Sequence, residues 1–92
     1  MGKKSQKILL FCNEVYDKNK PFIIDGFDDA IIGIDIVNRR LIYSNKKCIK
    51  ALKKQMPTDE ATDYFYTEIF DNKMYNKKVV FCEDNIKKIT NI

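Results

Sequence analysis

Seven cationic side chains and no acid lie between Asn38 and Met56, and these residues have the clearest capacity for chemistry in the chain. Ammonium and guanidinium groups form charge-assisted hydrogen bonds with phosphates and carboxylates. Such a patch binds nucleic acid or an acidic protein surface. The simpler interpretation is a solvated surface, since most charged side chains are exposed. The candidate partner-binding cations are Arg39, Arg40, Lys46, Lys47, Lys50, Lys53 and Lys54.

Acidic residues flank this basic block on both sides. The segment 21–37 holds four acids and no base, and the segment 57–72 holds five acids and no Lys or Arg. The formal net charge of +4 therefore understates the local fields. Two interpretations of the first acidic block stay open, namely turn formation and an acidic surface that imitates phosphates. Its members are Asp25, Asp28, Asp29 and Asp35.

The residue types that enzymes need are sparse in this chain. It contains no His, the usual general base near neutral pH, and no Gly-rich phosphate loop, nucleophile elbow or paired-carboxylate motif. The aspartates at 25, 28 and 29 lack the residue order of an EF-hand. We therefore expect a protein that is not an enzyme and holds no metal or cofactor. Widely spaced cysteines in apolar surroundings are expected to be reduced core thiols: Cys12, Cys48 and Cys82.

A β-hairpin is predicted to precede the basic helix. Residues 30–36 alternate at period two, with the isoleucines at 32, 34 and 36 on one face, and residues 40–44 form the second strand. Between them Asn38 is expected to adopt the left-handed conformation of a short turn. Gly33 inside the first strand indicates either a bulge or a close backbone approach, as at a ligand site.

The lysines belong to a predicted amphipathic helix at 46–56. Ser44 or Asn45 caps its first turn, and Pro57 ends it. Its apolar residues recur at helical spacing, which places the lysines on the remaining, outer surface. The predicted buried stripe is Cys48, Ile49, Leu52 and Met56.

Two further helices are predicted, at 6–16 and 59–71. The first has a helical apolar face (Ile8, Phe11, Cys12, Val15 and Tyr16), although a strand over 8–12 is an alternative. The second is capped by Thr58, and its inner stripe is Ala61, Tyr64, Phe65 and Ile69. Tyr66 lies off this stripe and is a candidate anchor for a partner.

These elements predict a single α+β domain over residues 1–92. A small antiparallel sheet, made of the hairpin 30–36/40–44 and a strand at 79–82, packs against helices 6–16, 46–56 and 59–71. An extended segment at 22–24 is placed at the sheet edge, and residues 86–92 form either a helical turn or a frayed tail. No apolar run is long enough to span a membrane, and the N-terminus lacks a signal-peptide pattern. The oligomeric state stays open, and pairing of edge strands would give a dimer.

Three segments resemble a widespread, uncharacterised family of small bacteriophage proteins. They are GFDDAIIGID at 26–35, LIYSNKKCIKAL at 41–52 and DEATDYFYTEI at 59–69. In order they match the family's GFD/E-A-IG strand, Tyr-bearing strand, CI..L helix and EA.EYF helix. The family's Tyr-Gly…Thr-Pro segment is absent, because Asn76 follows Tyr75. The resemblance implies a phage or prophage origin and a location in the bacterial host cytoplasm.

We therefore expect a small binding protein that inhibits a host or defence-system protein, as anti-CRISPR and anti-restriction proteins do. This expectation rests on analogy together with the charge pattern. One alternative is a nucleic-acid-binding accessory protein that uses the Lys-rich helix at 46–54. Another is a sponge for a small signalling nucleotide, with Gly33 and Arg39 or Arg40 near the ligand.

Overall fold

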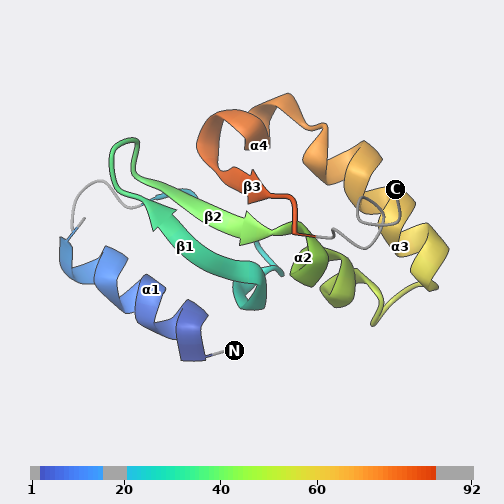
Figure 1. Cartoon of the computed structure of the whole chain (residues 1–92), viewed down its shortest axis with the longest axis horizontal. Helices are drawn as coiled ribbons and strands as arrows, with labels where there is room; N and C mark the ends of the chain where they lie inside the picture. Colours follow the sequence, from blue (N-terminus) through green and yellow to red (C-terminus); the bar gives the residue numbers. More distant parts are fainter. Residues whose placement is uncertain (1–2, 16–20, 85–92) are drawn as a thin grey trace.

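The chain folds as an α+β structure around a three-stranded sheet (Figure 1), which confirms the predicted fold class. The computed structural model describes residues 3–15 and 21–84. The predictions for Tyr16 and for the tail at 86–92 lie outside the described residues. In chain order the elements are α1 (Lys3–Val15), the 3₁₀ turn η1 (Asp28–Ala30), β1 (Ile31–Asp35), β2 (Arg40–Ser44), α2 (Asn45–Leu52), α3 (Thr58–Tyr64), the π-helical turn η2 (Phe65–Phe70), α4 (Lys73–Lys78) and β3 (Val80–Cys82).

The strand order is β1-β2-β3, and the sheet is mixed. β1 and β2 form the predicted antiparallel hairpin, whereas β3 pairs with β2 in parallel, so the prediction of a wholly antiparallel sheet was wrong. Parallel pairing is possible because the connection from β2 to β3 carries α2, α3, η2 and α4 and returns the chain to the same end of the sheet. The segment 22–24 is not a strand. β1 and β3 are the two edges, and dimer formation through an edge stays a prediction.

A bulge in β1 changes which isoleucines are buried. The register shifts between Ile31, which pairs with Tyr43, and Gly33, which pairs with Ile42. The extra residue shifts the alternation, so Ile31 and Ile34 pair with the buried residues Tyr43 and Leu41. Ile36 lies beyond the end of β1 and is 65% exposed. The prediction of a regular alternation over 30–36, with the isoleucines at 32, 34 and 36 on one face, was therefore wrong. The indication of a bulge at Gly33 is confirmed.

The hairpin turn places its left-handed residue one position later than predicted. Arg39, not Asn38, has a positive φ of 55°. Asn38 instead bonds back to Asp35: its backbone amide donates to Oδ1 over 3.3 Å and its side-chain amide donates to Oδ2 over 3.0 Å. These Asx-type hydrogen bonds fix the conformation of Asn38, and the left-handed backbone conformation occurs at the next residue, Arg39.

Helix α2 follows β2 directly and is capped as predicted. The Ser44 side chain accepts a hydrogen bond from the Lys47 amide. Cys48, Ile49 and Leu52 are buried, which confirms that part of the inner stripe. The helix ends at Leu52 rather than near Met56, and residues 53–56 form turns before Pro57.

The predicted helix at 59–71 is present as α3 followed by η2. Pro57 occupies its N-cap position and no side chain caps it, so the assignment of this role to Thr58 was wrong. Ala61, Phe65 and Ile69 are buried, but Tyr64 is 45% exposed. The wider π-helical turn brings both Phe65 and Phe70 against Phe81 of β3, with each ring centroid 5.8 Å from the Phe81 ring. The segment after η2, which lacked any predicted structure, forms α4.

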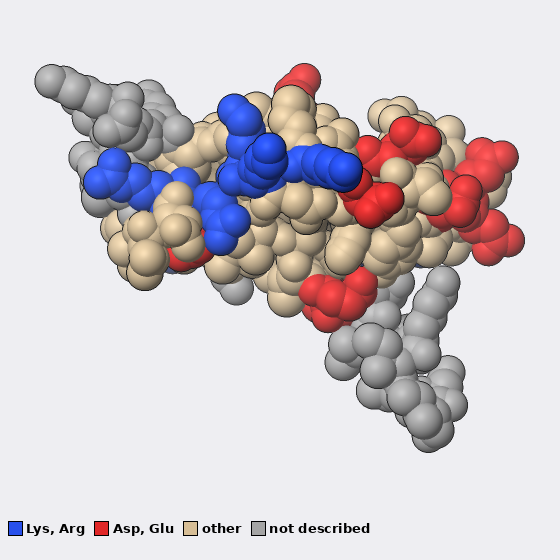
Figure 2. Space-filling view, turned by 90° about the horizontal axis from the view of Figure 1, so that it is seen from above, with Lys and Arg blue, Asp and Glu red and all other residues tan. Residues whose placement is uncertain are grey.

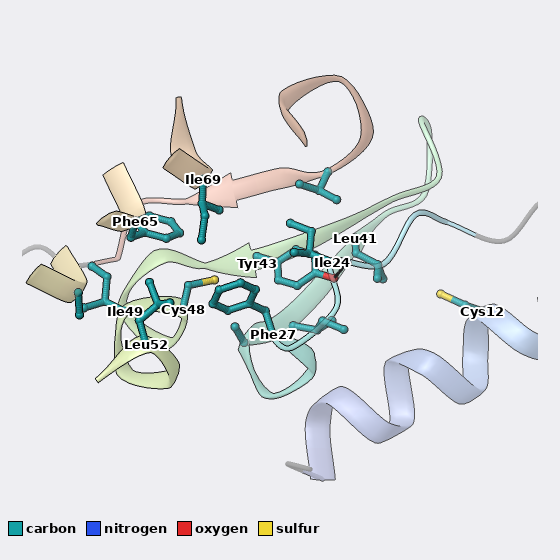
Figure 3. Packing of buried hydrophobic residues seen from close by; sticks show 14 residues of the cluster. Cys12, Ile24, Phe27, Leu41, Tyr43, Cys48, Ile49, Leu52, Phe65 and Ile69 are labelled. Atoms are coloured by element: carbon teal, nitrogen blue, oxygen red, sulfur yellow. Dashed lines mark hydrogen bonds between the residues drawn. The ribbon is translucent and has the colours of Figure 1, made fainter. Parts of the chain in front are cut away.

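The core lies between the sheet, α2 and η2 (Figure 3). The Tyr43 hydroxyl accepts a 2.9 Å hydrogen bond from the Ile24 amide, so the segment before η1 is bound to the middle of the sheet. Helix α1 lies beside β1 (Figure 1), and Cys12 of this helix belongs to the buried core, whereas Phe11 is 39% exposed. The alternative of a strand over 8–12 was wrong, because these residues are helical.

Candidate functional site

The seven predicted cations do not form one patch. All five lysines of the basic block are exposed along and just after α2, while Arg39 and Arg40 lie at the tip of the hairpin. The two groups line different surface hollows, and each hollow contains residues that lie far away in the sequence. Figure 2 shows one face of the molecule, on which Lys and Arg form a band and many acidic side chains lie towards one end.

The first hollow, which we name the mixed-charge groove, lies between α2 and the segment 25–29. Its volume is about 630 Å³. Three lysines line one side and three aspartates line the other, so the basic block and the first acidic block of the sequence face each other. Its lining residues are Asp25, Gly26, Asp28, Asp29, Lys47, Lys50, Ala51 and Lys54.

The acidic wall of the mixed-charge groove is held in place by buried neighbours of the aspartates. Phe27 and Ala30 belong to the core, and η1 packs against α2. Gly26 has a φ of +89°, a conformation that suits glycine and reverses the chain before Phe27. The aspartates are therefore carried on a segment whose backbone is fixed by the core. Within the described residues, no ion pair joins the three groove lysines to Asp25 or Asp28.

The basic wall is oriented through the first turn of α2. Because β3 runs parallel to β2, its end lies beside the start of α2. Asp84 Oδ1 accepts a 2.9 Å hydrogen bond from the Lys46 amide, and Ser44 Oγ donates to Asp84 Oδ2. Burial raises the pKa of Asp84, but the hydrogen bonds from Ser44 and from the Lys46 amide outweigh it and the net pKa is lowered. The carboxylate also suits the positive end of the helix dipole.

Glu83 adds a second contact at the same point. One of its carboxylate oxygens accepts a 3.0 Å hydrogen bond from the Asn45 side chain, which is fully buried. The Tyr66 hydroxyl donates to the same carboxylate over 2.8 Å. Tyr66 also packs against the core, and it lines neither of the two hollows. The predicted anchor Tyr66 therefore contacts Glu83 beside the start of α2 and does not line the groove.

The second hollow, which we name the cationic hollow, lies between the hairpin tip and the end of α4. Its volume is about 560 Å³. Among the described residues, four cations and no carboxylate line it, and two of the four come from α4, which the sequence did not single out. The lining residues are Pro21, Phe22, Asn38, Arg39, Arg40, Lys77 and Lys78.

Two contacts define the walls of the cationic hollow. Arg40 pairs with Asp35 at 3.2 Å, and its Nε is buried without a hydrogen-bond partner among the described residues. The hydrogen bond from the Asn38 side chain, helped by Arg40, lowers the pKa of Asp35. On the opposite wall Lys78 Nζ lies 5.1 Å from the centre of the Phe22 ring, at cation–π distance.

Cys12, Cys48 and Gly33 lie outside the two hollows. Burial raises the pKa of Cys48 to about 12 and also raises the pKa of Cys12, so both thiols are neutral near pH 7. Gly33 is absent from the lining of the cationic hollow, and a Cβ atom there would lie at an ordinary 3.5 Å from Ile42. Among residues 3–15 and 21–84, no group of three or more His, Cys, Asp or Glu side chains is arranged to hold a metal ion.

No family model, curated protein or solved structure matches the chain. In the part of the chain that is described, no helix combines the length and the apolar character that crossing a membrane requires. The two hollows and the resemblance of three segments to the phage family are therefore the basis for a proposed function.

Proposed function

We propose that the chain is a small, non-catalytic binding protein of phage type that inhibits a host or defence-system protein in the bacterial cytoplasm, as anti-CRISPR and anti-restriction proteins do. The proposed contact surface is the mixed-charge groove with the two neighbouring lysines of the same block, Lys46 and Lys53. This proposal combines the phage-family resemblance with the charge arrangement around α2.

The choice of a protein partner rests on one observation: side chains of both charge signs line the same groove. Lys47, Lys50 and Lys54 face the segment that bears three aspartates. A nucleic-acid backbone presents only negative charge, and it would be repelled by the aspartates as it approached the lysines. A protein surface can present acids to the lysines and bases to the aspartates. Such complementarity gives specificity and rapid association.

The same observation disfavours the alternative of a nucleic-acid-binding accessory protein that uses helix 46–54. That function requires the lysines to act as an uninterrupted cationic face, with affinity that falls steeply as salt rises. Absence of a mobility shift with DNA or RNA at low salt, for a chain that still binds a protein partner, would exclude it.

Affinity capture from bacterial lysate tests the proposal. A tagged wild-type chain is compared with the triple variant Lys47→Gln/Lys50→Gln/Lys54→Gln and with a matched control, Lys73→Gln/Lys77→Gln/Lys78→Gln. Both variants remove three exposed charges, the first from the groove and the second from α4. We expect one stoichiometric protein partner with the wild type and the control, and its loss with the groove variant. Equal capture by all three chains would contradict the proposed surface.

A further inference from the structure

We propose that a third hollow, which we name the acid-rimmed hollow, receives an arginine side chain of the protein partner. It lies between the segment 24–27, the end of α2 and the helical segment formed by α3 and η2, and its volume is about 380 Å³. This inference rests on the proposed protein-binding function and names one residue type that the partner presents. The lining side chains that carry the argument are Asp25, Phe27, Leu52, Tyr64, Glu68 and Ile69.

The floor of the acid-rimmed hollow is apolar and already packed. Phe27, Leu52 and Ile69 line it, and each is at most 9% exposed. Figure 3 shows all three within the cluster of buried residues. Because these side chains are fixed by the core, the hollow exists before a partner arrives. The methylene groups of a long side chain can pack on such a floor while its charged end stays at the rim.

The rim carries negative charge only. Among the described residues that line the hollow, Asp25 and Glu68 are the charged ones, and neither a Lys nor an Arg joins them. Both residues are exposed, and within residues 3–15 and 21–84 neither carboxylate has an ion-pair partner. A cation is attracted to this rim and an anion is repelled. Charge complementarity therefore selects a basic side chain of the partner.

Tyr64 favours arginine over the other side chains that could enter. It lines the hollow and is 45% exposed, so its ring is accessible to a partner. A guanidinium group stacks on an aromatic face and has donors on several sides, so that it can serve carboxylates from two walls. An ammonium group is more strongly hydrated and lacks the planar face. A neutral apolar side chain would desolvate Asp25 and Glu68 without pairing with them.

The acid-rimmed hollow is continuous with the mixed-charge groove. Asp25, Gly26 and Ala51 line both. A partner that places an arginine in the hollow can therefore place carboxylates against Lys50 and Lys54 of the adjoining groove. Neighbouring positions of opposite charge fix the orientation in which the partner binds. Arginine in a preformed hollow is also a frequent source of binding energy at protein interfaces.

NMR titration of the isotope-labelled chain with single-residue probes tests the hollow without the partner. The probes are N-acetyl-arginine amide, N-acetyl-citrulline amide, which has a similar shape but no charge, and N-acetyl-leucine amide. We expect saturable shifts of the Ala51, Glu68 and Ile69 amides with the arginine probe, and binding of the citrulline probe that is about fivefold weaker. Absence of saturable shifts at these amides, equal binding of the citrulline probe or tighter binding of the leucine probe would overturn the proposal.

Glu68→Gln and the matched control Glu60→Gln then locate the site. Each variant removes one exposed acid from the helical segment formed by α3 and η2, but Glu60 does not line the hollow. We expect Glu68→Gln to weaken binding of the arginine probe about two- to fivefold, as for loss of an exposed ion pair, and Glu60→Gln to bind like the wild type. Equal weakening by both variants would indicate a general effect of charge and would overturn the assignment.

The probe titrations and the lysate capture can fail separately. A chain that captures its partner but does not bind the arginine probe would keep the proposed function and lose the arginine site. A chain that binds the arginine probe at the hollow but captures no protein would keep the arginine site and lose the proposed inhibition.

Discussion

The Asp84 carboxylate accepts a 2.9 Å hydrogen bond from the backbone amide of Lys46, a residue 38 positions earlier in the chain. The contact exists because β3 runs parallel to β2 and ends beside the first turn of α2. It fills one of the amide positions that a helix leaves without an internal partner. The residues after β3 therefore determine how the lysines of α2 are presented to a partner.

Removing this contact should destabilise the fold. We predict that Asp84→Ala lowers the free energy of unfolding by roughly 1–3 kcal/mol, because it removes an acceptor shared by the Ser44 hydroxyl and the Lys46 amide. Urea denaturation followed by circular dichroism measures the change. Asp71→Ala, at an exposed position after η2, is the control and should change stability little. Equal midpoints for the two variants would refute the role given to Asp84.

Acid should weaken the same contact. The pKa of Asp84 is lower in the folded chain than in the unfolded one, so the unfolded state binds more protons and stability rises with pH. Its contribution is complete above the ordinary Asp value of about 3.9 and is lost as the pH falls through the folded value. Asp35 acts in the same direction. We expect the free energy of unfolding of Asp84→Asn to change less with pH below about 4 than that of the wild type. Parallel curves of this free energy against pH for the variant and the wild type would contradict this.

Tyr43 should stabilise the fold through its hydroxyl as well as its ring. The oxygen accepts a hydrogen bond from the Ile24 amide in the core, and burial raises the pKa of Tyr43 to about 12. Tyr43→Phe leaves that amide without a partner, so we predict a loss of roughly 1–3 kcal/mol. Chemical denaturation measures it. A loss below about 0.5 kcal/mol would show that the amide finds another acceptor.

Gly26 and Gly33 should respond differently to substitution by alanine. Gly26 has a positive φ, so Gly26→Ala is expected to cost roughly 1–2 kcal/mol although no atom lies within 4 Å of the new Cβ. Gly33→Ala meets only ordinary contacts with Ile42 and is expected to change stability by less than about 0.5 kcal/mol. Thermal unfolding of the pair checks this. A larger loss for Gly33→Ala would mean that β1 does require a close approach there.

The local features of the fold were predictable from sequence, because they depend on short spacing. Ser44 caps α2 as its side-chain chemistry indicates, and Cys48, Ile49 and Leu52 are buried at helical spacing. The inner face of β1 was not predictable in the same way. Side chains alternate strictly between the two faces only in a regular strand. The bulge between Ile31 and Gly33 breaks this alternation and changes the residues that face the core.

Which cations line which hollow depends on the tertiary structure. The sequence pattern grouped Arg39 and Arg40 with the lysines of α2, whereas the fold joins them to Lys77 and Lys78. The pair at 77–78 is visible in the sequence as two adjacent lysines, but nothing local shows which element it faces. Because β3 runs parallel to β2, the end of α4, which precedes β3, lies near the hairpin tip. Residue spacing in so short a segment does not reveal the direction of the strand.

The most direct test of the proposed inhibition is phage plating on bacteria that carry a nucleic-acid-targeting defence system, in a panel of CRISPR and restriction types. The chain, expressed in the host, should restore plating against at least one system. Lys47→Gln/Lys50→Gln/Lys54→Gln should abolish that rescue while Lys73→Gln/Lys77→Gln/Lys78→Gln preserves it. No rescue in any strain by a chain that is expressed and folded, or rescue that survives loss of the groove lysines, would contradict inhibition through the mixed-charge groove.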